Sequence, residues 1–142
     1  DLLQRLYFLP SEPYFPKWSP RRIAKYYAPF YPNFNHELFE ETLSEFRVEA
    51  NKPLNRVSFG QKRRAQLAFA LATRTQVLLL DEPTANLDND STEAIETWLL
   101  EEIRRRQIAL LWVAHDVGQI HWVADAHYRI LGTSLERADG SD

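Results

Sequence analysis

The sequence has no cysteine and no methionine among its 142 residues. Without cysteine the chain can form no disulfide, no thiolate metal site and no thiol nucleophile. Glycine is scarce as well, and none of the four glycines is followed by lysine: Gly60, Gly118, Gly132 and Gly140. A phosphate-binding loop of the pattern Gly-x-x-x-x-Gly-Lys-Ser/Thr is therefore absent from this sequence.

Long apolar runs and an excess of positive charge are also lacking. The longest runs, residues 77–80 (VLLL) and 108–114 (IALLWVA), are far shorter than the ~20 residues that span a bilayer. Lysine and arginine number 17 against 20 aspartates and glutamates, which argues against a surface built to bind nucleic acid. The N-terminus has neither an initiator methionine nor the pattern of a signal peptide, so we expect the chain to be part of a longer protein.

The composition is that of a globular domain with one sizeable core, at 44% hydrophobic and 26% charged residues. Residues 5–10 predict a strand that stops at Pro10, and a proline-rich loop follows. Ser19 and Pro20 form a typical helix start. Asn35 can cap a second helix, so a small helical section is predicted between this loop and Pro53.

The second half alternates strand and helix patterns. The wholly apolar run in residues 76–83 (QVLLLDEP) is typical of a strand buried on both faces of a parallel sheet. Residues 108–116 repeat that pattern, after a predicted helix from about Asp90 to Arg106. A short helix at residues 117–124 and a closing strand at 127–131 complete the alternation. We therefore expect an α/β fold, a parallel sheet flanked by helices.

Positive charge gathers where another helix begins. Residues 57–66 (VSFGQKRRAQ) place a Ser-x-Gly-Gln turn directly before Lys62, Arg63 and Arg64. Cations are disfavoured at a helix N-terminus by roughly 0.3–1 kcal/mol because the helix dipole is already positive there. The same free N–H groups and partial charge suit a phosphate. We therefore expect an anion at this turn, with the three cations near it and partly facing solvent.

Two predicted strands end in chemically active side chains. Asp81 and Glu82 follow one strand, and His115 and Asp116 follow the other. In open parallel sheets the working residues lie just beyond the carboxyl ends of the strands, so these groups are expected to meet at one edge. An acid pair, a histidine and an anion cradle together indicate phosphoryl transfer, in which a carboxylate holds Mg²⁺ and another group orients water.

Five motifs, in order, resemble those of the ATPase subunits of ATP-binding cassette (ABC) transporters. Residues 7–13 (YFLPSEP) resemble the strand entering the Q-loop, and residues 57–61 (VSFGQ) resemble the Leu-Ser-Gly-Gly-Gln signature. Residues 77–83 (VLLLDEP) resemble the Walker B strand with its following glutamate, residues 85–88 (ANLD) the D-loop, and residues 113–116 (VAHD) the switch histidine. The resemblance covers essentially the whole chain and implies part of a P-loop NTPase-type domain.

The resemblance also implies how the chain is divided and what its site residues do. Residues 1–10 would be a core strand leading to the Q-loop, residues 11–56 the Q-loop and helical subdomain, and residues 57–142 the signature helix with the Walker B, D-loop and switch parts. Asp81 would hold Mg²⁺, and Glu82 would be the general base. His115 would contact the γ-phosphate of ATP.

The remaining site residues would act across a dimer. Ser58, Gly60 and Gln61 would bind the γ-phosphate of a nucleotide held by the opposite subunit, because two ATPase domains of this family pair head to tail. Asp88 would lie on the D-loop at the interface between the two subunits. The resemblance implies ATP and Mg²⁺ as cofactors, a second ATPase domain, identical or different, and a separate transmembrane subunit as partners, and no nucleic acid. ATP hydrolysis would then power transport from the cytoplasmic face of the membrane.

Several residues depart from the family pattern. Val57 and Phe59 replace the leucine and the first glycine of the signature, and Ser11 stands where the Q-loop glutamine is expected. Without a P-loop, these residues alone should bind ATP poorly and hydrolyse it hardly at all. The alternatives are a soluble ABC ATPase of translation or DNA repair, and a degenerate non-catalytic half that supplies only its signature motif to a partner.

Two further groups of residues have simpler interpretations. His36, His121 and His127 show no metal-ligand spacing, so we interpret them as structural or surface residues. An aromatic cluster is interpreted as core, the alternative being a groove that receives a helix of the membrane subunit; its members are Tyr14, Phe15, Trp18, Tyr26, Tyr27, Phe30, Tyr31 and Phe34.

Overall fold

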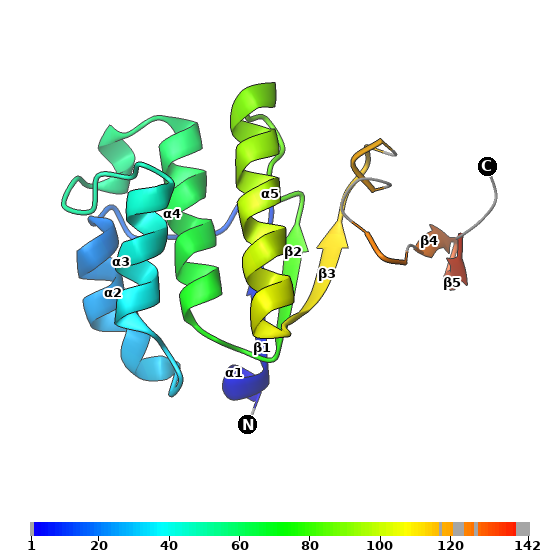
Figure 1. Cartoon of the computed structure of the whole chain (residues 1–142), viewed down its shortest axis with the longest axis horizontal. Helices are drawn as coiled ribbons and strands as arrows, with labels where there is room; N and C mark the ends of the chain where they lie inside the picture. Colours follow the sequence, from blue (N-terminus) through cyan, green and yellow to red (C-terminus); the bar gives the residue numbers. More distant parts are fainter. Residues whose placement is uncertain (1, 117, 121–123, 127, 139–142) are drawn as a thin grey trace.

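The computed structural model of the chain describes residues 2–116, 118–120, 124–126 and 128–138. Figure 1 shows its helices and strands in order. The helices are α1 (Leu2–Arg5), α2 (Pro20–Tyr27), α3 (His36–Glu45), α4 (Phe59–Ala72) and α5 (Asn89–Arg106), with 3₁₀ turns at Ala28–Phe30 and Leu54–Arg56. The strands are β1 (Leu6–Leu9), β2 (Val77–Asp81), β3 (Ala109–Val113), β4 (Tyr128–Leu131) and β5 (Ser134–Arg137).

A three-stranded parallel sheet confirms the expected α/β fold. Its strand order is β1-β2-β3, and β2 pairs with both neighbours in parallel. The connections pass through α2, α3 and α4 between β1 and β2, and through α5 between β2 and β3. Because all three strands run in the same direction, their carboxyl ends meet at one edge of the sheet.

One face of this sheet is buried and the other is open. Leu9 and Leu80 pair in register, are fully buried, and share one core with residues of α4 and α5. On the opposite face the exposed fractions are 51% for Phe8, 56% for Leu111 and 41% for Val113. The expectation that residues 76–83 form a strand buried on both faces is therefore wrong within the described part of the chain, because the shared core lies on a single face.

The helical section begins as predicted. Ser19 caps α2 by accepting a hydrogen bond from the backbone N–H of Arg22 at 3.3 Å. Asn35 caps α3 through the N–H of Leu38 at 2.9 Å. Figure 1 shows α2 and α3 on the side of α4 that faces away from the sheet. This section contacts α4, the helix that starts after Ser58, and it also contacts the sheet directly, because the rings of Tyr31 and of Tyr7 on β1 lie 5.6 Å apart.

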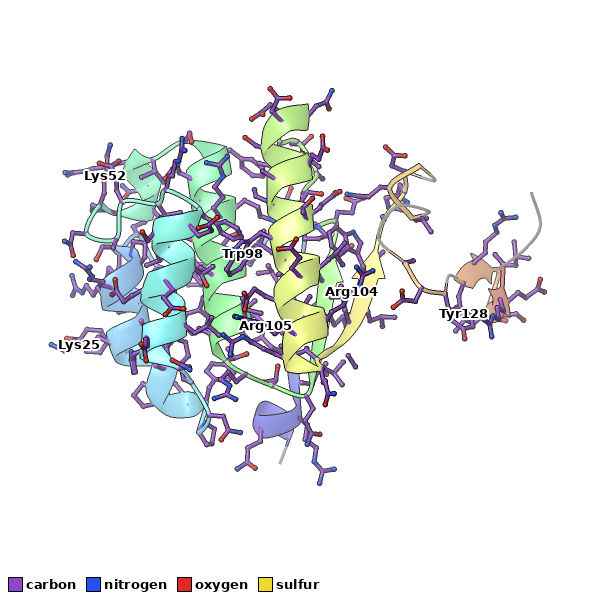
Figure 2. The ribbon with its side chains drawn as sticks, in the orientation of Figure 1. Lys25, Lys52, Trp98, Arg104, Arg105 and Tyr128 are labelled. Carbon is purple, nitrogen blue, oxygen red and sulfur yellow. The ribbon has the colours of Figure 1, made fainter. Side chains whose placement is uncertain are left out.

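The aromatic cluster divides into two sets. Phe15, Trp18, Tyr31 and Phe34 are partly buried and pack against the core, as interpreted from the sequence. Tyr14, Tyr26, Tyr27 and Phe30 are exposed, so the core interpretation is wrong for this half. A separate aromatic contact ties α5 to the helical section, because Trp98 (Figure 2) lies 4.9 Å from Phe46 between ring centroids.

The last described residues form a separate hairpin. The predicted closing strand is present as β4, but it pairs antiparallel with β5 and takes no part in the parallel sheet. Figure 1 shows this hairpin beyond β3. Of the helix expected at residues 117–124, residues 118–120 are helical, while 117 and 121–123 lie outside the described residues, as do His121 and His127. In the part of the chain described here, no helix is both long and apolar enough to cross a membrane.

Candidate active site

The strands β2 and β3 end at the same edge of the sheet, as predicted from the sequence. Asp81, the last residue of β2, is in register with Val113, the last residue of β3. The backbone N–H of Glu82 continues the ladder by donating to the carbonyl of Val113 at 2.8 Å. Beyond this bond, Nε2 of His115 lies 3.0 Å from Oε1 of Glu82. The predicted meeting of the acid pair and the histidine at one sheet edge is therefore confirmed.

Glu82 has an unusual backbone conformation. Its φ angle of 47° is left-handed, a region that costs a residue other than glycine about 1–3 kcal/mol and persists where neighbouring contacts hold it. The N–H of Glu82 is held by Val113, and its carbonyl accepts a hydrogen bond from Nη2 of Arg63 at 3.3 Å. These contacts on both sides of the residue stabilise the conformation that places its carboxylate beside His115.

The acid–histidine pair can be reached from solvent. The side chain of His115 is 84% exposed and that of Glu82 is 29% exposed. Asp81 is half-buried at the same edge. The pair thus combines a carboxylate held by its neighbours with an imidazole open to an incoming group, which is a suitable arrangement for proton transfer to or from a bound ligand.

The signature turn caps the helix that follows it. Ser58 is extended, with ψ of 162°, and its Oγ accepts a hydrogen bond from the N–H of Gln61 at 3.2 Å. A Cβ added at Gly60 would lie 3.6 Å from Leu87 and 4.0 Å from the Ser58 hydroxyl, both ordinary contact distances. Space inside this chain therefore does not require glycine at position 60. The contact with Leu87 places this turn beside the D-loop.

The D-loop ends in a second helix cap. Oδ1 of Asp88 accepts a hydrogen bond from the N–H of Ser91 at 2.8 Å, which begins α5. That hydrogen bond is the main cause that lowers the pKa of Asp88 below its ordinary value. Gln61 differs from Ser58 and Asp88, because its Oε1 is a buried atom without a hydrogen-bond partner in the described structure.

The expected orientation of the three cations is wrong for Arg63. Its side chain is 2% exposed and points inward, toward the turn after β2. Burial lowers the pKa of Arg63, and the charge of Asp81 acts in the opposite direction. Arg64 was also expected near an anion at the helix start, but its side chain instead donates a hydrogen bond to the hydroxyl of Ser91 at 2.6 Å. The physical reason is that the segments after β1 and β2 present backbone carbonyls to α4, and the N–H groups of the buried Arg63 guanidinium bind them.

A sequence signal for Arg63 existed in the spacing of α4. Arg63 lies four residues before Leu67 and seven before Ala70, both buried, and that spacing places all three on one face of a helix. The run of three cations obscured this periodicity, because adjacent charged residues at a helix start are usually solvated.

A second buried network was missed from the sequence. Thr84, two residues after Glu82, donates to Oε1 of the buried Glu96 on α5 at 2.9 Å. Nε2 of Gln119 donates to the hydroxyl of Thr84 at 2.7 Å and also to Oε1 of Glu96. The network ties the segment after His115 to the turn after β2.

The comparisons with known proteins agree with this geometry. The sequence model of the ABC transporter family matches residues 17–85, which include the signature turn and the end of β2. A curated relative, the cobalt import ATP-binding protein CbiO of Rhodobacter capsulatus, is 42% identical over 88 residues, or 61% of this chain and 31% of the relative. These matches support an ABC ATPase nucleotide-binding domain fragment.

Solved structures of ABC ATP-binding proteins have the same fold. An ABC transporter ATP-binding protein from Pyrococcus furiosus superposes with a TM-score of 0.68 at 25% identity, covering 80% of this chain and 58% of that one. A dimeric ATP-binding cassette in a post-hydrolysis state, bound to ADP and phosphate, superposes with a TM-score of 0.67 at 24% identity, covering 82% and 54%. The chain spans less than half the length of the curated relatives that it matches.

The residues at this sheet edge suit a Mg²⁺–phosphate complex better than a site in which protein side chains alone surround the metal. Among the described residues no group of three or more His, Cys, Asp or Glu side chains could hold a metal ion. Mg²⁺ commonly keeps several waters and binds one or two carboxylates together with substrate phosphates. Asp81 supplies one such carboxylate at the sheet edge, so the donor set fits this mode of binding. Ser11, at the Q-loop position, is exposed.

Proposed function

We propose that this chain is part of an ABC-type ATPase that binds and hydrolyses ATP at a head-to-tail dimer interface. The observation that carries the proposal is the 3.0 Å contact between Nε2 of His115 and Oε1 of Glu82 at the carboxyl edge of the sheet. Phosphoryl transfer depends mainly on positioning and electrostatic stabilisation, and a sheet edge that fixes an acid beside a histidine supplies positioning.

Glu82 acts as the general base in this proposal. Its partly exposed carboxylate accepts the proton of the water that attacks the γ-phosphate. His115, which is more exposed, reaches the same phosphate and orients Glu82 through their contact. When bound, Mg²⁺ supplies charge neutralisation on the phosphates. Asp81 is the residue that would hold it, with waters and phosphate oxygens as the other ligands.

The signature turn and the D-loop would serve the opposite subunit. Ser58, Gly60 and Gln61 open α4, where a helix start offers N–H groups to a phosphate. Asp88 lies next to this turn, because Leu87 contacts the position of Gly60. A dimeric ATP-binding cassette of the same fold is bound to ADP and phosphate, which supports nucleotide binding by a dimer of this fold.

The division of the chain into segments and its partner proteins are proposed as the family resemblance implies. Residues 1–10 would be the segment leading to the Q-loop, although its strand is only β1 (Leu6–Leu9), because Leu2–Arg5 are helical. Residues 11–56 would be the Q-loop and helical subdomain, and residues 57–142 the signature, Walker B, D-loop and switch parts. Its partners are a second ATPase domain and a separate transmembrane subunit, and it acts peripherally at the cytoplasmic face of the membrane. The phosphate-binding loop absent from these residues would be supplied by the rest of the longer protein.

The test is phosphate release from ATP by the full-length protein in the presence of Mg²⁺, measured over a range of protein concentrations. A head-to-tail dimer predicts that specific activity rises with protein concentration. It also predicts that Ser58→Arg, which fills the signature turn, abolishes this activity. No hydrolysis at any concentration would contradict the proposal and favour a non-catalytic half.

A further inference from the structure

Arg63 makes an unusually dense set of buried contacts. Its guanidinium donates to the side chain of Gln66 at 3.2 Å and to four backbone carbonyls. Those carbonyls belong to Pro10 at 3.2 Å, Asp81 at 3.1 Å, Glu82 at 3.3 Å and Pro83 at 2.8 Å. A single side chain of α4 therefore binds the chain just after β1 and just after β2.

These carbonyls lie where strand pairing stops. The paired register of β1 and β2 ends at Leu9 and Leu80, so Pro10, Glu82 and Pro83 lie beyond it. Buried carbonyls without partners are costly, and a planar guanidinium offers five donors in a rigid fork. A lysine ammonium at the same place is a compact point charge that lacks this fork. The contacts of Arg63 thus require arginine in particular.

The contacts bear directly on Glu82. Its left-handed φ of 47° is flanked by one bond from its N–H to Val113 and one bond from Arg63 to its carbonyl. The neighbouring carbonyls of Asp81 and Pro83 are bound by the same guanidinium. Loss of Arg63 would free three consecutive peptide groups around the residue whose carboxylate contacts His115.

We propose that Arg63 is a positioning residue for ATP hydrolysis, which holds the Glu82 carboxylate beside His115 by binding the turn between β2 and α5. This inference rests on the proposed function, in which Glu82 is the general base. Arg63 is buried, at 2% exposed, and in this proposal it acts through the backbone of Glu82.

The experiment compares steady-state ATP hydrolysis by the full-length protein with that of Arg63→Lys. The expected result is a kcat at least tenfold lower, with a KM for ATP within twofold of the parent. Arg63→Gln, whose shorter neutral amide has too few donors for these five acceptors, should lower kcat by a similar factor. Thr73→Val is the matched control, because it removes buried hydrogen bonds at the other end of α4. It should lower the unfolding midpoint and leave kcat unchanged. An equal loss of kcat in Thr73→Val would overturn the proposal.

A double-mutant cycle separates positioning from general stability. If Arg63 acts through Glu82, Arg63→Lys causes no further loss of turnover in a Glu82→Gln background. A loss by the same factor as in the parent background would overturn the proposal. Unchanged kcat in Arg63→Lys, with turnover lost in Glu82→Gln, rejects the role of Arg63 alone. Unchanged turnover in Glu82→Gln rejects the proposed function itself.

Discussion

Nε2 of His115 lies 3.0 Å from Oε1 of Glu82, although the two residues follow different strands. The contact results from the parallel register of β2 and β3, which pairs Asp81 with Val113 and leaves the next residues of both strands at one edge. Arg63 supports this edge from inside the protein, and His115 faces outward. The candidate site is therefore held by hydrogen bonds on its protein side and exposed on its ligand side.

Replacing Ser58 by aspartate separates helix capping from ATP binding. Aspartate caps a helix about as well as serine, so the free energy of unfolding should change by less than about 0.5 kcal/mol. A negative charge at the signature turn should repel the γ-phosphate, so ATP-dependent dimerisation of the full-length protein should be lost. Light scattering after size-exclusion chromatography, with and without ATP, measures this effect.

The matched control for that variant is Asn35→Asp, which places the same charge at the cap of α3. It should dimerise with ATP as the parent does. Dimerisation of Ser58→Asp at the parental ATP concentration would show that the signature turn does not meet a phosphate.

The buried carboxylate of Glu96 should be important for stability. Glu96→Ala leaves the hydroxyl of Thr84 and the amide of Gln119 without their shared acceptor, which should lower the free energy of unfolding by about 2–3 kcal/mol. Glu96→Gln keeps an acceptor oxygen and should cost less. Urea unfolding checks both values. The exposed Glu93 on the same helix is the control, and Glu93→Ala should change stability by less than about 0.5 kcal/mol.

Stability should fall at alkaline pH because of Tyr7. Burial, with a smaller contribution from Tyr31, raises the pKa of Tyr7 above its ordinary value. The folded protein therefore keeps this phenol protonated at a pH where the unfolded chain has lost the proton. The stabilisation is complete below about pH 10, the pKa of an unfolded tyrosine, and is lost as the pH rises through the raised folded pKa, by about 1.4 kcal/mol per pH unit.

Tyr7→Phe should remove that part of the pH dependence. Urea unfolding at about pH 8 and about pH 11 measures it, because the two values lie on either side of the ordinary tyrosine pKa. Tyr14, which is fully in solvent, provides the control: Tyr14→Phe should lose stability at high pH as the parent does. The same alkaline loss in Tyr7→Phe would assign the effect to another group.

The sheet edge could be predicted from sequence because its signals are local. An apolar run that ends in Asp81 and Glu82, and a second run that ends in His115, each indicate a strand with a polar tip, and parallel pairing then brings the tips together. The helix caps at Ser19, Asn35 and Ser58 were equally predictable. In each, the side chain accepts a hydrogen bond from a backbone N–H only three residues further along the chain.

The features that could not be predicted depend on contacts between distant segments. Arg63 binds Pro10, 53 positions away along the chain. The helical spacing places Arg63 on the buried face of α4, but it does not indicate which distant carbonyls the side chain binds. The open face of the sheet was also missed, because an apolar run looks the same whether one or both faces are covered. β4 looks like a further core strand, yet its partner is β5, and a strand pattern does not specify its partner.

The central claim, that Glu82 and His115 form an ATP-hydrolysing edge, is tested most directly by single-turnover phosphate release from ATP bound to the full-length Glu82→Gln protein. The glutamine occupies the same space but cannot accept a proton from water. The account predicts normal ATP binding with phosphate release slowed by about a hundredfold or more. Release at the parental rate from fully bound ATP would contradict it.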